Sequence, residues 1–410
     1  MKSNLIWSLV RLGVVGNARK PAIRNRALTI PSFFAGWIAT EGAVPLAVLH
    51  AARSVRNARR GAYRGREGRV AAATDLVTLG GLSKLVLDAR RTDDEFVEAL
   101  SPYLGAEELA ERPRTVRYGA ALPVVTGGRT TVRERRIGYV PDAHWRNMLD
   151  VYLPKASPAP TGADGTPLRR PAIVEIHGGG WVVGNKDQQG VPLLHHMVRQ
   201  GWVGFNINYR LAPRSRFPTQ LVDCKRALAY IRANADRFGI DPDFVCVTGG
   251  SAGGHLCALV ALTANDPEFQ PGFEDADTTV AAAVPFYGVY DLADEEGVMV
   301  DGFVKFIEQV VVGSKFAGDE ERWRRYSPVN RVRADAPPTM IVHGSVDTLV
   351  PVEQGRTFAR RMAETSEHAV VYAELAGANH AFDIFPSTRS LRTVEYVERF
   401  LTGVREGRIK

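Results

Sequence analysis

Cysteine is scarce in this sequence: the 410 residues contain three, Cys224, Cys246 and Cys257. An odd number in a chain of this length argues against a disulfide framework, and all three lie in apolar stretches typical of a buried core. No Cys/His spacing of the kind that holds a zinc ion is present. Phosphate loops and dinucleotide-binding fingerprints are also missing. We therefore expect no bound metal and no cofactor.

Acidic residues are almost missing from the first 69 residues, which hold 2 Asp/Glu against 13 Lys/Arg. The remaining residues hold 43 Asp/Glu and 39 Lys/Arg, so a strongly basic front precedes a mildly acidic body. The overall composition, 45% hydrophobic and 24% charged, is ordinary for a soluble globular protein. We expect two parts: a basic, partly apolar helical region over residues 1–130 and a catalytic domain over residues 131–410.

The basic front encloses an apolar segment, Leu28–Leu49, in which Glu41 is the one charged residue. Its 22 residues are long enough to cross a bilayer. Several residues interrupt it, however: Pro31, Gly36, Glu41, Gly42 and Pro45. Three interpretations stay open: an interfacial or re-entrant membrane anchor, a soluble cap over an active site, and a true span. The flanking basic residues would attract an anionic membrane surface.

Other features bear on where the protein acts. Arg11 interrupts the apolar residues of Met1–Val15 and no clear cleavage site follows, so this segment is not typical of a signal peptide. A second apolar stretch, Val70–Leu87, predicts an ordinary helix, because it carries Asp75 and Lys84. No nucleic-acid-binding motif accompanies the basic front. We expect a cytoplasmic protein, free or attached to the cytoplasmic face of a membrane through residues 1–69, that binds no nucleic acid.

The run Val245–Gly254, V-C-V-T-G-G-S-A-G-G, is the most informative part of the sequence. An apolar strand ends in glycines, Ser251 stands at the turn, and small residues follow into a helix. Such a turn lifts a serine hydroxyl clear of its backbone as a nucleophile. The same pattern also fits a glycine-rich turn that packs closely or holds a phosphate. A base, an acid and oxyanion donors elsewhere in the chain would favour the nucleophile.

Hydrolases with this serine turn carry the acid and then the histidine later in the chain. His380 follows the predicted strand Ala369–Leu375 in a loop, and it is our candidate base. Asp347 follows the short apolar strand Thr339–Val342 and is the candidate acid, with Asp291 as the alternative. The acid would hold the histidine in one tautomer and stabilise the imidazolium.

Backbone donors for an oxyanion are predicted at two places. One is the N–H group of Ala252, directly after the serine. The others lie in the loop that follows the apolar strand Ile173–Ile176, where His177 and Trp181 bracket three glycines. Glycines let backbone N–H groups approach a substrate without a side chain in the way. The candidate donors here are Gly179 and Gly180, with Gly178 as a further candidate.

The apolar pattern predicts a doubly wound, mainly parallel sheet with helices on both faces. Leu221–Phe238 has the spacing of an amphipathic helix. The loop Ser157–Gly165 should lie at the surface, and Asp291–Arg333 is long enough for helices that cover the site. The expected strands are Leu149–Leu153, Ile173–Ile176, Val203–Tyr209, Val245–Val247, Ala281–Phe286, Thr339–Val342 and Ala369–Leu375.

Four motifs in this order resemble the α/β-hydrolase superfamily, and within it the hormone-sensitive-lipase-like carboxylesterases, including the esterase set of mycobacteria and related actinobacteria. The resemblance covers roughly residues 130–410. It implies an α/β-hydrolase fold with a helical N-terminal extension or cap, a triad of Ser251, Asp347 and His380, and oxyanion donors at Gly179, Gly180 and Ala252. The matching segments are His177–Trp181, Tyr209–Pro213, Gly249–Gly254 and the loops of Asp347 and His380.

Two departures from that family affect the substrate. The family usually has an acidic residue before the serine, where this chain has Gly250. Its acid motif is D-P-L-x-D, whereas residues 343–351 read H-G-S-V-D-T-L-V-P, similar to feruloyl-esterase-type and kynurenine-formamidase-type relatives. We expect a serine hydrolase of short- to medium-chain acyl esters or lipids. Two alternatives are an arylformamidase or amidase with the same triad and a non-catalytic ligand receptor on this fold.

Overall fold

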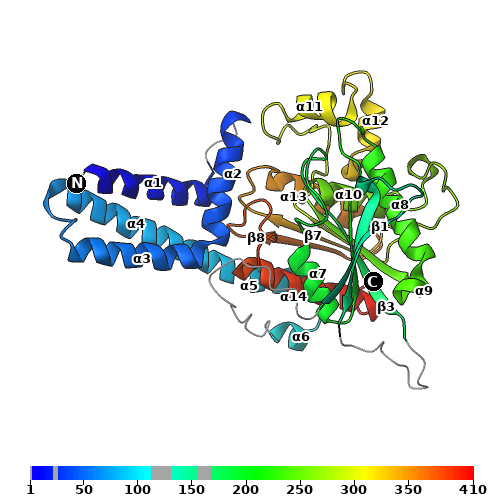
Figure 1. The fold of residues 1–410 in the computed structure, drawn as a ribbon, viewed down its shortest axis with the longest axis horizontal. Coiled ribbons are helices and arrows are strands. Elements are labelled where there is room, and N and C mark those ends of the chain that lie inside the picture. Colours follow the sequence, from blue (N-terminus) through cyan, green and yellow to red (C-terminus); the bar gives the residue numbers. More distant parts are fainter. Residues whose placement is uncertain (1, 22–25, 112–130, 156–167) are drawn as a thin grey trace.

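An eight-stranded sheet forms the centre of the catalytic body (Figure 1). The computed structural model describes residues 2–21, 26–111, 131–155 and 168–410. The strands run in the order β1-β2-β4-β3-β5-β6-β7-β8, with β1, β2 and β4 paired antiparallel and the rest parallel. Their bounds are β1 (Thr131–Gly138), β2 (Met148–Pro154), β3 (Arg170–Ile176), β4 (Val203–Ile207), β5 (Ile240–Gly250), β6 (Ala282–Phe286), β7 (Thr339–Gly344) and β8 (Val370–Leu375).

Helices cover both faces of the sheet, as the predicted fold class requires. Apolar side chains of α5, α7 and α14 pack on one face, and those of α8, α10 and α13 pack on the other. Short α9, α11 and α12 lie in the connections. The bounds are α5 (Thr92–Leu100), α7 (Val191–Arg199), α8 (Thr219–Ala233), α9 (Ala235–Phe238), α10 (Ala252–Leu262), α11 (Phe303–Phe306), α12 (Glu320–Arg325), α13 (Val352–Thr365) and α14 (Thr388–Arg405).

Several predicted elements differ from the observed ones at their ends. The predicted helix Leu221–Phe238 is two helices, because the chain leaves the helical conformation at Asn234 between α8 and α9. Strand β4 stops at Ile207, so the predicted strand to Tyr209 is two residues too long. The nucleophile strand β5 is longer than predicted and reaches Gly250. The predicted loop Ser157–Gly165 lies outside the described residues.

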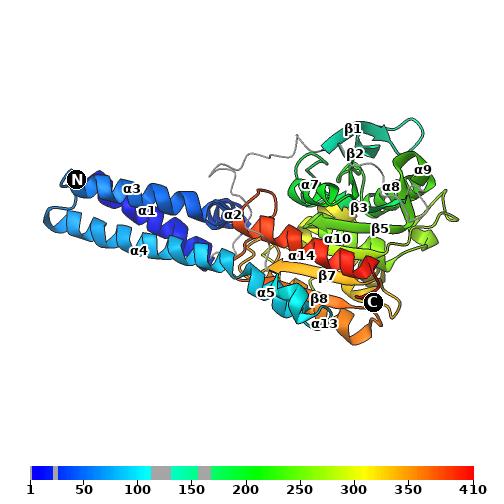
Figure 2. The same cartoon turned by 90° about the horizontal axis from the view of Figure 1, so that it is seen from below.

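The N-terminal residues form a helical arm that projects from the body, and α2 stands between the two (Figures 1 and 2). Helix α5 belongs to the body rather than to the arm, since Phe96 and Leu100 are fully buried in its core. Strand β1 begins at Thr131, and residues 112–130 lie outside the described part. The bounds are α1 (Lys2–Arg19), α2 (Arg26–Glu41), α3 (Ala43–Arg59), α4 (Gly65–Arg90) and α6 (Ala106–Ala110).

The segment Leu28–Leu49 is not one straight helix. Helix α2 ends at Glu41 and α3 begins at Ala43, and the two axes are bent by 83°. A single straight span over these residues is therefore wrong. Within the described residues, one helical stretch, Gly65–Leu100, is long and apolar enough to cross a membrane by itself. The predicted helix Val70–Leu87 lies inside this stretch, as part of α4.

Candidate active site

Ser251 occupies the sharp turn between β5 and α10. Its backbone angles, φ 61° and ψ −123°, lie where residues other than glycine are strained by about 1–3 kcal/mol. Neighbouring backbone holds the turn from both sides: the Ser251 N–H donates to the Phe286 carbonyl at 3.0 Å, and the Ser251 carbonyl accepts from the His255 N–H at 3.0 Å. The side chain is half-buried, so this turn leaves the serine accessible at the carboxyl edge of the sheet.

Asp347 and His380 are brought together by the loops that follow β7 and β8. The Nδ1 atom of His380 lies 2.7 Å from Oδ2 of Asp347, and both side chains are buried. The other carboxylate oxygen of Asp347 accepts from the N–H groups of Leu349 and Val350, at 2.9 and 2.8 Å. Because its carboxylate is fixed by backbone donors, Asp347 can orient the imidazole and leave Nε2 for the reacting proton.

Asn379 ties the same two loops to each other. Its side-chain oxygen accepts from the N–H and the hydroxyl of Thr348, at 3.1 and 3.0 Å, and from the N–H of His380 at 2.7 Å. Thr348 follows Asp347 directly. The histidine and the acid are therefore positioned by one buried amide as well as by their own hydrogen bond, which limits relative movement of the two loops.

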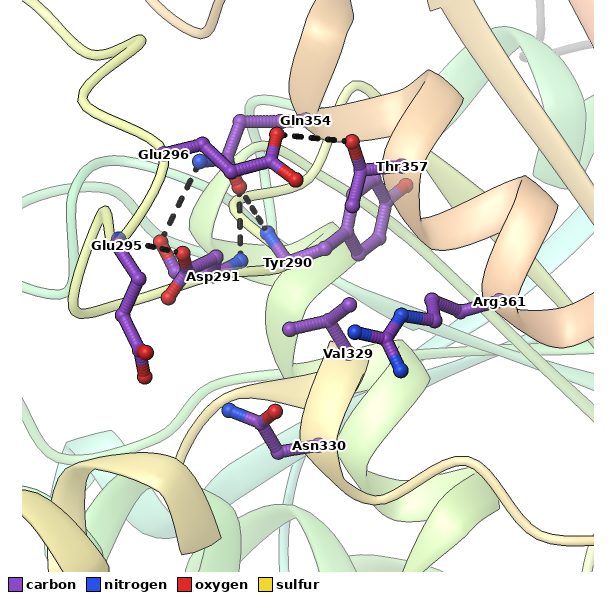
Figure 3. A pocket seen from close by; sticks show the side chains of 9 residues that line it. All are labelled: Tyr290, Asp291, Glu295, Glu296, Val329, Asn330, Gln354, Thr357 and Arg361. Carbon is purple, nitrogen blue, oxygen red and sulfur yellow. Dashed lines mark hydrogen bonds between the residues drawn. The ribbon is translucent and has the colours of Figure 1, made fainter.

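Asp291, the alternative acid, lies in a different place. Its carboxylate accepts from the N–H groups of Ala293 and Glu295, at 3.0 and 2.7 Å, and so stabilises its own turn. It lines a surface pocket of about 220 Å³ with Tyr290, Glu295, Glu296, Val329, Asn330, Gln354, Thr357 and Arg361 (Figure 3). Among the described residues, no three His, Cys, Asp or Glu side chains gather as a metal site there or elsewhere.

The glycine loop after β3 presents its backbone next to Ser251. Gly179 has φ 113°, and a methyl group there would lie 2.3 Å from the Val183 carbonyl oxygen, so the position requires glycine. The Gly178 N–H donates to the Gln189 side chain at 2.6 Å and is therefore engaged. Over the described ranges, no acceptor faces the N–H groups of the three remaining candidate donors, Gly179, Gly180 and Ala252.

The segment after β4 braces this loop, which explains the motif Tyr209–Pro213. Tyr209 stacks on His177 with ring centroids 4.2 Å apart and donates its hydroxyl to the His177 carbonyl at 2.8 Å. The Ala212 N–H donates to the Trp181 carbonyl at 2.9 Å. Burial lowers the pKa of His177 to about 4, so this ring stays neutral at pH 7.

Trp181 anchors the far end of the loop against α10. Its Nε1 atom donates to Nδ1 of His255 at 3.2 Å, and Nε2 of His255 lies 2.8 Å from the Tyr326 carbonyl. Since Nδ1 is the acceptor, the proton of His255 is on Nε2 and donates to Tyr326. Burial lowers the pKa of His255 to about 4, which keeps this bridge uncharged. Tyr326 belongs to the predicted insertion Asp291–Arg333. This insertion therefore supports the glycine loop through His255 and Trp181.

Tyr287 lies beside Gly250, the position at which the resembling family has an acidic residue. A methyl group on Gly250 would lie 2.6 Å from the Tyr287 hydroxyl, so no side chain fits at that position. The Tyr287 ring lies 4.6 Å from the His380 ring, and its hydroxyl donates to the buried carboxyl of Asp383. Burial raises the pKa of Asp383. Gly250, unusual at this position, was the one signal in the sequence for this arrangement.

Helix α2 supplies side chains to the site that the sequence analysis did not assign. Phe33 meets the His380 ring edge-on with centroids 6.1 Å apart, and Trp37 donates from Nε1 to the Ala381 carbonyl at 2.8 Å. A methyl group on Gly36 would touch the Asn379 amide at 2.8 Å. The aromatic residues at positions i and i+4 of the apolar segment were the available signal. Helix α2, which forms the first part of the segment Leu28–Leu49, thus packs against the loop that carries His380.

The chain is similar in sequence and in fold to known esterases. The BD-FAE family model matches residues 149–362, more than half of the chain. A butyrate-bound structure of a thermophilic esterase, Est2, from Thermogutta terrifontis superposes with a TM-score of 0.52 and 27% identity. That match covers 67% of this chain and 95% of the esterase.

Two relatives come from Mycobacterium tuberculosis. The probable carboxylic ester hydrolase LipM is 37% identical over 98% of this chain and 93% of its own length. The esterase LipC is 39% identical over 82% of each chain. The protein therefore belongs to the hormone-sensitive-lipase-like carboxylesterases of the α/β-hydrolase superfamily. The LipM match extends through the N-terminal helices, so the similarity is not confined to the catalytic body.

Proposed function

We propose that the chain hydrolyses carboxylic esters through a covalent acyl-enzyme formed on Ser251. The observation that carries this proposal is the hydrogen bond between His380 and Asp347, because it directs Nε2 of the imidazole away from the acid. Nε2 takes the Ser251 proton while Oγ attacks the ester carbonyl carbon. The proton then passes to the leaving alcohol as the carbon–oxygen bond breaks.

The second half of the reaction uses the same groups. Water gives a proton to His380 and attacks the acyl carbon, and Ser251 recovers its proton when the acid leaves. The N–H groups of Gly179, Gly180 and Ala252 would receive the negative oxygen in both tetrahedral intermediates. Removal of one such donor typically costs about 2.7–4 kcal/mol of barrier. Gly178 is left out of the donor set, since Gln189 already accepts from it.

We infer that the acyl group is short or medium in length. The support is the butyrate held by the similar Est2 esterase and the aromatic wall that Phe33 provides beside His380. A formamidase or amidase reaction with the same triad is the alternative, favoured by the H-G-S-V-D sequence around Asp347.

The test is a series of p-nitrophenyl esters from acetate to palmitate with purified full-length enzyme, beside N-formylkynurenine. We expect kcat/KM to peak between butyrate and octanoate and Ser251→Ala to abolish turnover. Faster hydrolysis of N-formylkynurenine than of every ester would overturn the ester assignment. If a fluorophosphonate probe fails to label the wild-type chain, the receptor interpretation replaces the enzyme.

We further propose that the enzyme works attached to the cytoplasmic face of a membrane. The support is the excess of 13 basic over 2 acidic residues in positions 1–69, which would attract anionic headgroups. Fractionation of a cell lysate should place the full-length chain, and its esterase activity, in the membrane pellet. Recovery of the activity in the supernatant at low salt would contradict the attachment.

A further inference from the structure

The arm is built from three long helices that pack side by side. Helices α1 and α3 both pack on α4, and α2 closes the end of the bundle nearest the catalytic body (Figures 1 and 2). Small residues make the helix contacts: a methyl group on Gly81 would lie 2.5 Å from Val15, and Ala18 is fully buried. Close approach through small residues is how helices associate in lipid as well as in water.

Apolar side chains cover the outside of the arm. The described residues include 19 exposed large hydrophobic side chains, and 16 of them lie between positions 6 and 87. A patch of this extent is unusual on a soluble monomer and marks a surface made for another apolar phase. Each of the three helices contributes, as Ile6, Trp7, Leu9 and Val10 on α1, Val44, Val48, Leu49 and Val55 on α3, and Val70, Leu76, Val77 and Leu87 on α4.

Polar side chains lie between the helices instead. Asp75 on α4 is buried, and it accepts from Arg11 on α1 at 3.1 Å and from the Tyr63 hydroxyl at 2.6 Å. Its backbone carbonyl lies 2.8 Å from Nε2 of His50 on α3. Ionisable residues inside a membrane face the bundle interior and pair in this way. The arm thus has an apolar outer surface and an interior that holds these buried polar groups as well as the apolar cluster of Val15, Leu82 and Leu85.

The length of the apolar surface matches a bilayer. On α4, the residues between Arg69 and Arg90 number 20, which is about 30 Å of helix and the thickness of a hydrocarbon core. Lys84 is the one basic residue among them, and it pairs with Asp88 one turn further on. Exposed basic side chains flank the apolar surface at both ends, with Arg56, Arg59, Arg60, Arg64, Arg66 and Arg69 at the tip and Arg19, Lys20, Arg90 and Arg91 next to the body.

We propose that α1, α3 and α4 insert together through a lipid bilayer as a transmembrane bundle. A helix that lies in the membrane surface keeps a polar face toward water. Here, all three helices turn apolar side chains outward and polar ones inward, which a surface position would not satisfy. The inference rests on the proposed membrane attachment and replaces its peripheral form with insertion, and it is independent of the ester chemistry.

The test uses the full-length chain reconstituted in vesicles of phosphatidylcholine and phosphatidylglycerol. Leu76→Cys, near the middle of α4, and Arg59→Cys, at the tip, each carry an NBD fluorophore. We expect the label at position 76 to be quenched at least threefold more by a nitroxide at the bilayer centre than by one at the headgroup. The label at position 59 should show the opposite order. The protein should float with the vesicles after carbonate extraction.

Matched arginine variants test whether the apolar surface is responsible. Leu76→Arg should lower the fraction that floats at least fivefold, whereas Leu168→Arg, at an exposed leucine on the catalytic body, should leave it unchanged. Release of the wild-type chain by carbonate would overturn insertion in favour of surface attachment. A label at position 76 with the fluorescence of NBD in water would overturn insertion in favour of a soluble arm. Crosslinking of two chains through position 76 would overturn it in favour of an arm that pairs with a second copy. Hydrolysis of p-nitrophenyl butyrate, measured on each sample, reports the esterase proposal separately.

Discussion

Trp37 and Ala381 are joined by a hydrogen bond of 2.8 Å from the indole Nε1 to the carbonyl oxygen, although 344 positions separate them in sequence. Ala381 follows His380 and has a φ of 58°, a conformation unusual for a residue with a side chain. The N-terminal helix α2 therefore supports a strained turn directly beside the candidate base.

Replacing Trp37 by phenylalanine should remove the hydrogen bond and keep most of the stacking on Phe385, whose ring centroid is 4.7 Å away. The free energy of unfolding should fall by about 1 kcal/mol, the usual net value of such a bond. We expect kcat for p-nitrophenyl butyrate to fall severalfold because the His380 turn loosens. Trp145→Phe, at an exposed tryptophan, is the control. An unchanged kcat with lowered stability would show that α2 only stabilises the fold.

Asp347→Asn should lower kcat by a factor of about 10⁴ while the fold is retained. The amide cannot accept from both backbone N–H groups and also hold His380 in the required tautomer, and loss of that tautomer has an effect of this size in serine hydrolases. Asp291→Asn is the matched control, since its carboxylate caps a turn in the separate pocket of Figure 3. Similar losses in both variants would contradict the choice of Asp347 as the acid.

A methyl group at Gly250 should destabilise the protein by about 1–3 kcal/mol, the range observed for overpacked cores. The cause is the 2.6 Å approach to the Tyr287 hydroxyl, which is held by Asp383 and has no room to retreat. Gly105→Ala offers a comparison, because a methyl group there meets nothing within 4 Å. Urea denaturation of both variants measures the difference. Equal stabilities would show that Tyr287 moves aside freely.

The three buried histidines His177, His196 and His255 should each contribute a loss of stability as the pH drops from 6.5 toward 4. Burial lowers the pKa of His177, His196 and His255 from 6.5 to about 4, so in this window the unfolded chain binds more protons than the folded one. His255→Gln should therefore flatten the dependence of the unfolding free energy on pH. His144→Gln, at an exposed histidine, should not. The measurement is urea denaturation at pH 4.5, 5.5 and 7.5, and parallel profiles for all variants would refute the assignment.

The sheet and its fold class could be predicted because the spacing of apolar residues along each strand and the glycines at the turns are local properties of the sequence. Each of the seven predicted strands overlaps an observed one, and the predicted fold and family are confirmed by the comparisons. Strand β1 was missed because Arg133, Glu134, Arg135 and Arg136 make it polar, as suits an edge strand. The roles of Ser251, Asp347 and His380 stay predictions until the variants above are measured.

What could not be predicted depends on contacts between distant segments. The sequence marks Gly42 and Pro45 as interruptions of Leu28–Leu49, but it does not show that the two helices meet there at 83°. Likewise, the sequence does not show that the Gln189 side chain accepts from the Gly178 N–H. This contact depends on the loop before α7 lying beside the glycine loop. The apolar outer surface of the arm could not be predicted either, since helical period alone does not say which face is inside.

Helix α2 is fixed to the catalytic body at a second point, where the buried carboxylate of Glu41 accepts from the Ser387 hydroxyl and lies 3.4 Å from Arg389. The 83° corner that follows begins directly after this anchor. The contacts of Glu41 therefore hold the start of the bend against the catalytic body, so they help to fix the direction in which the arm leaves the body. If the arm inserts into a bilayer as proposed, its tilt would determine how far Ser251 is turned toward the membrane surface.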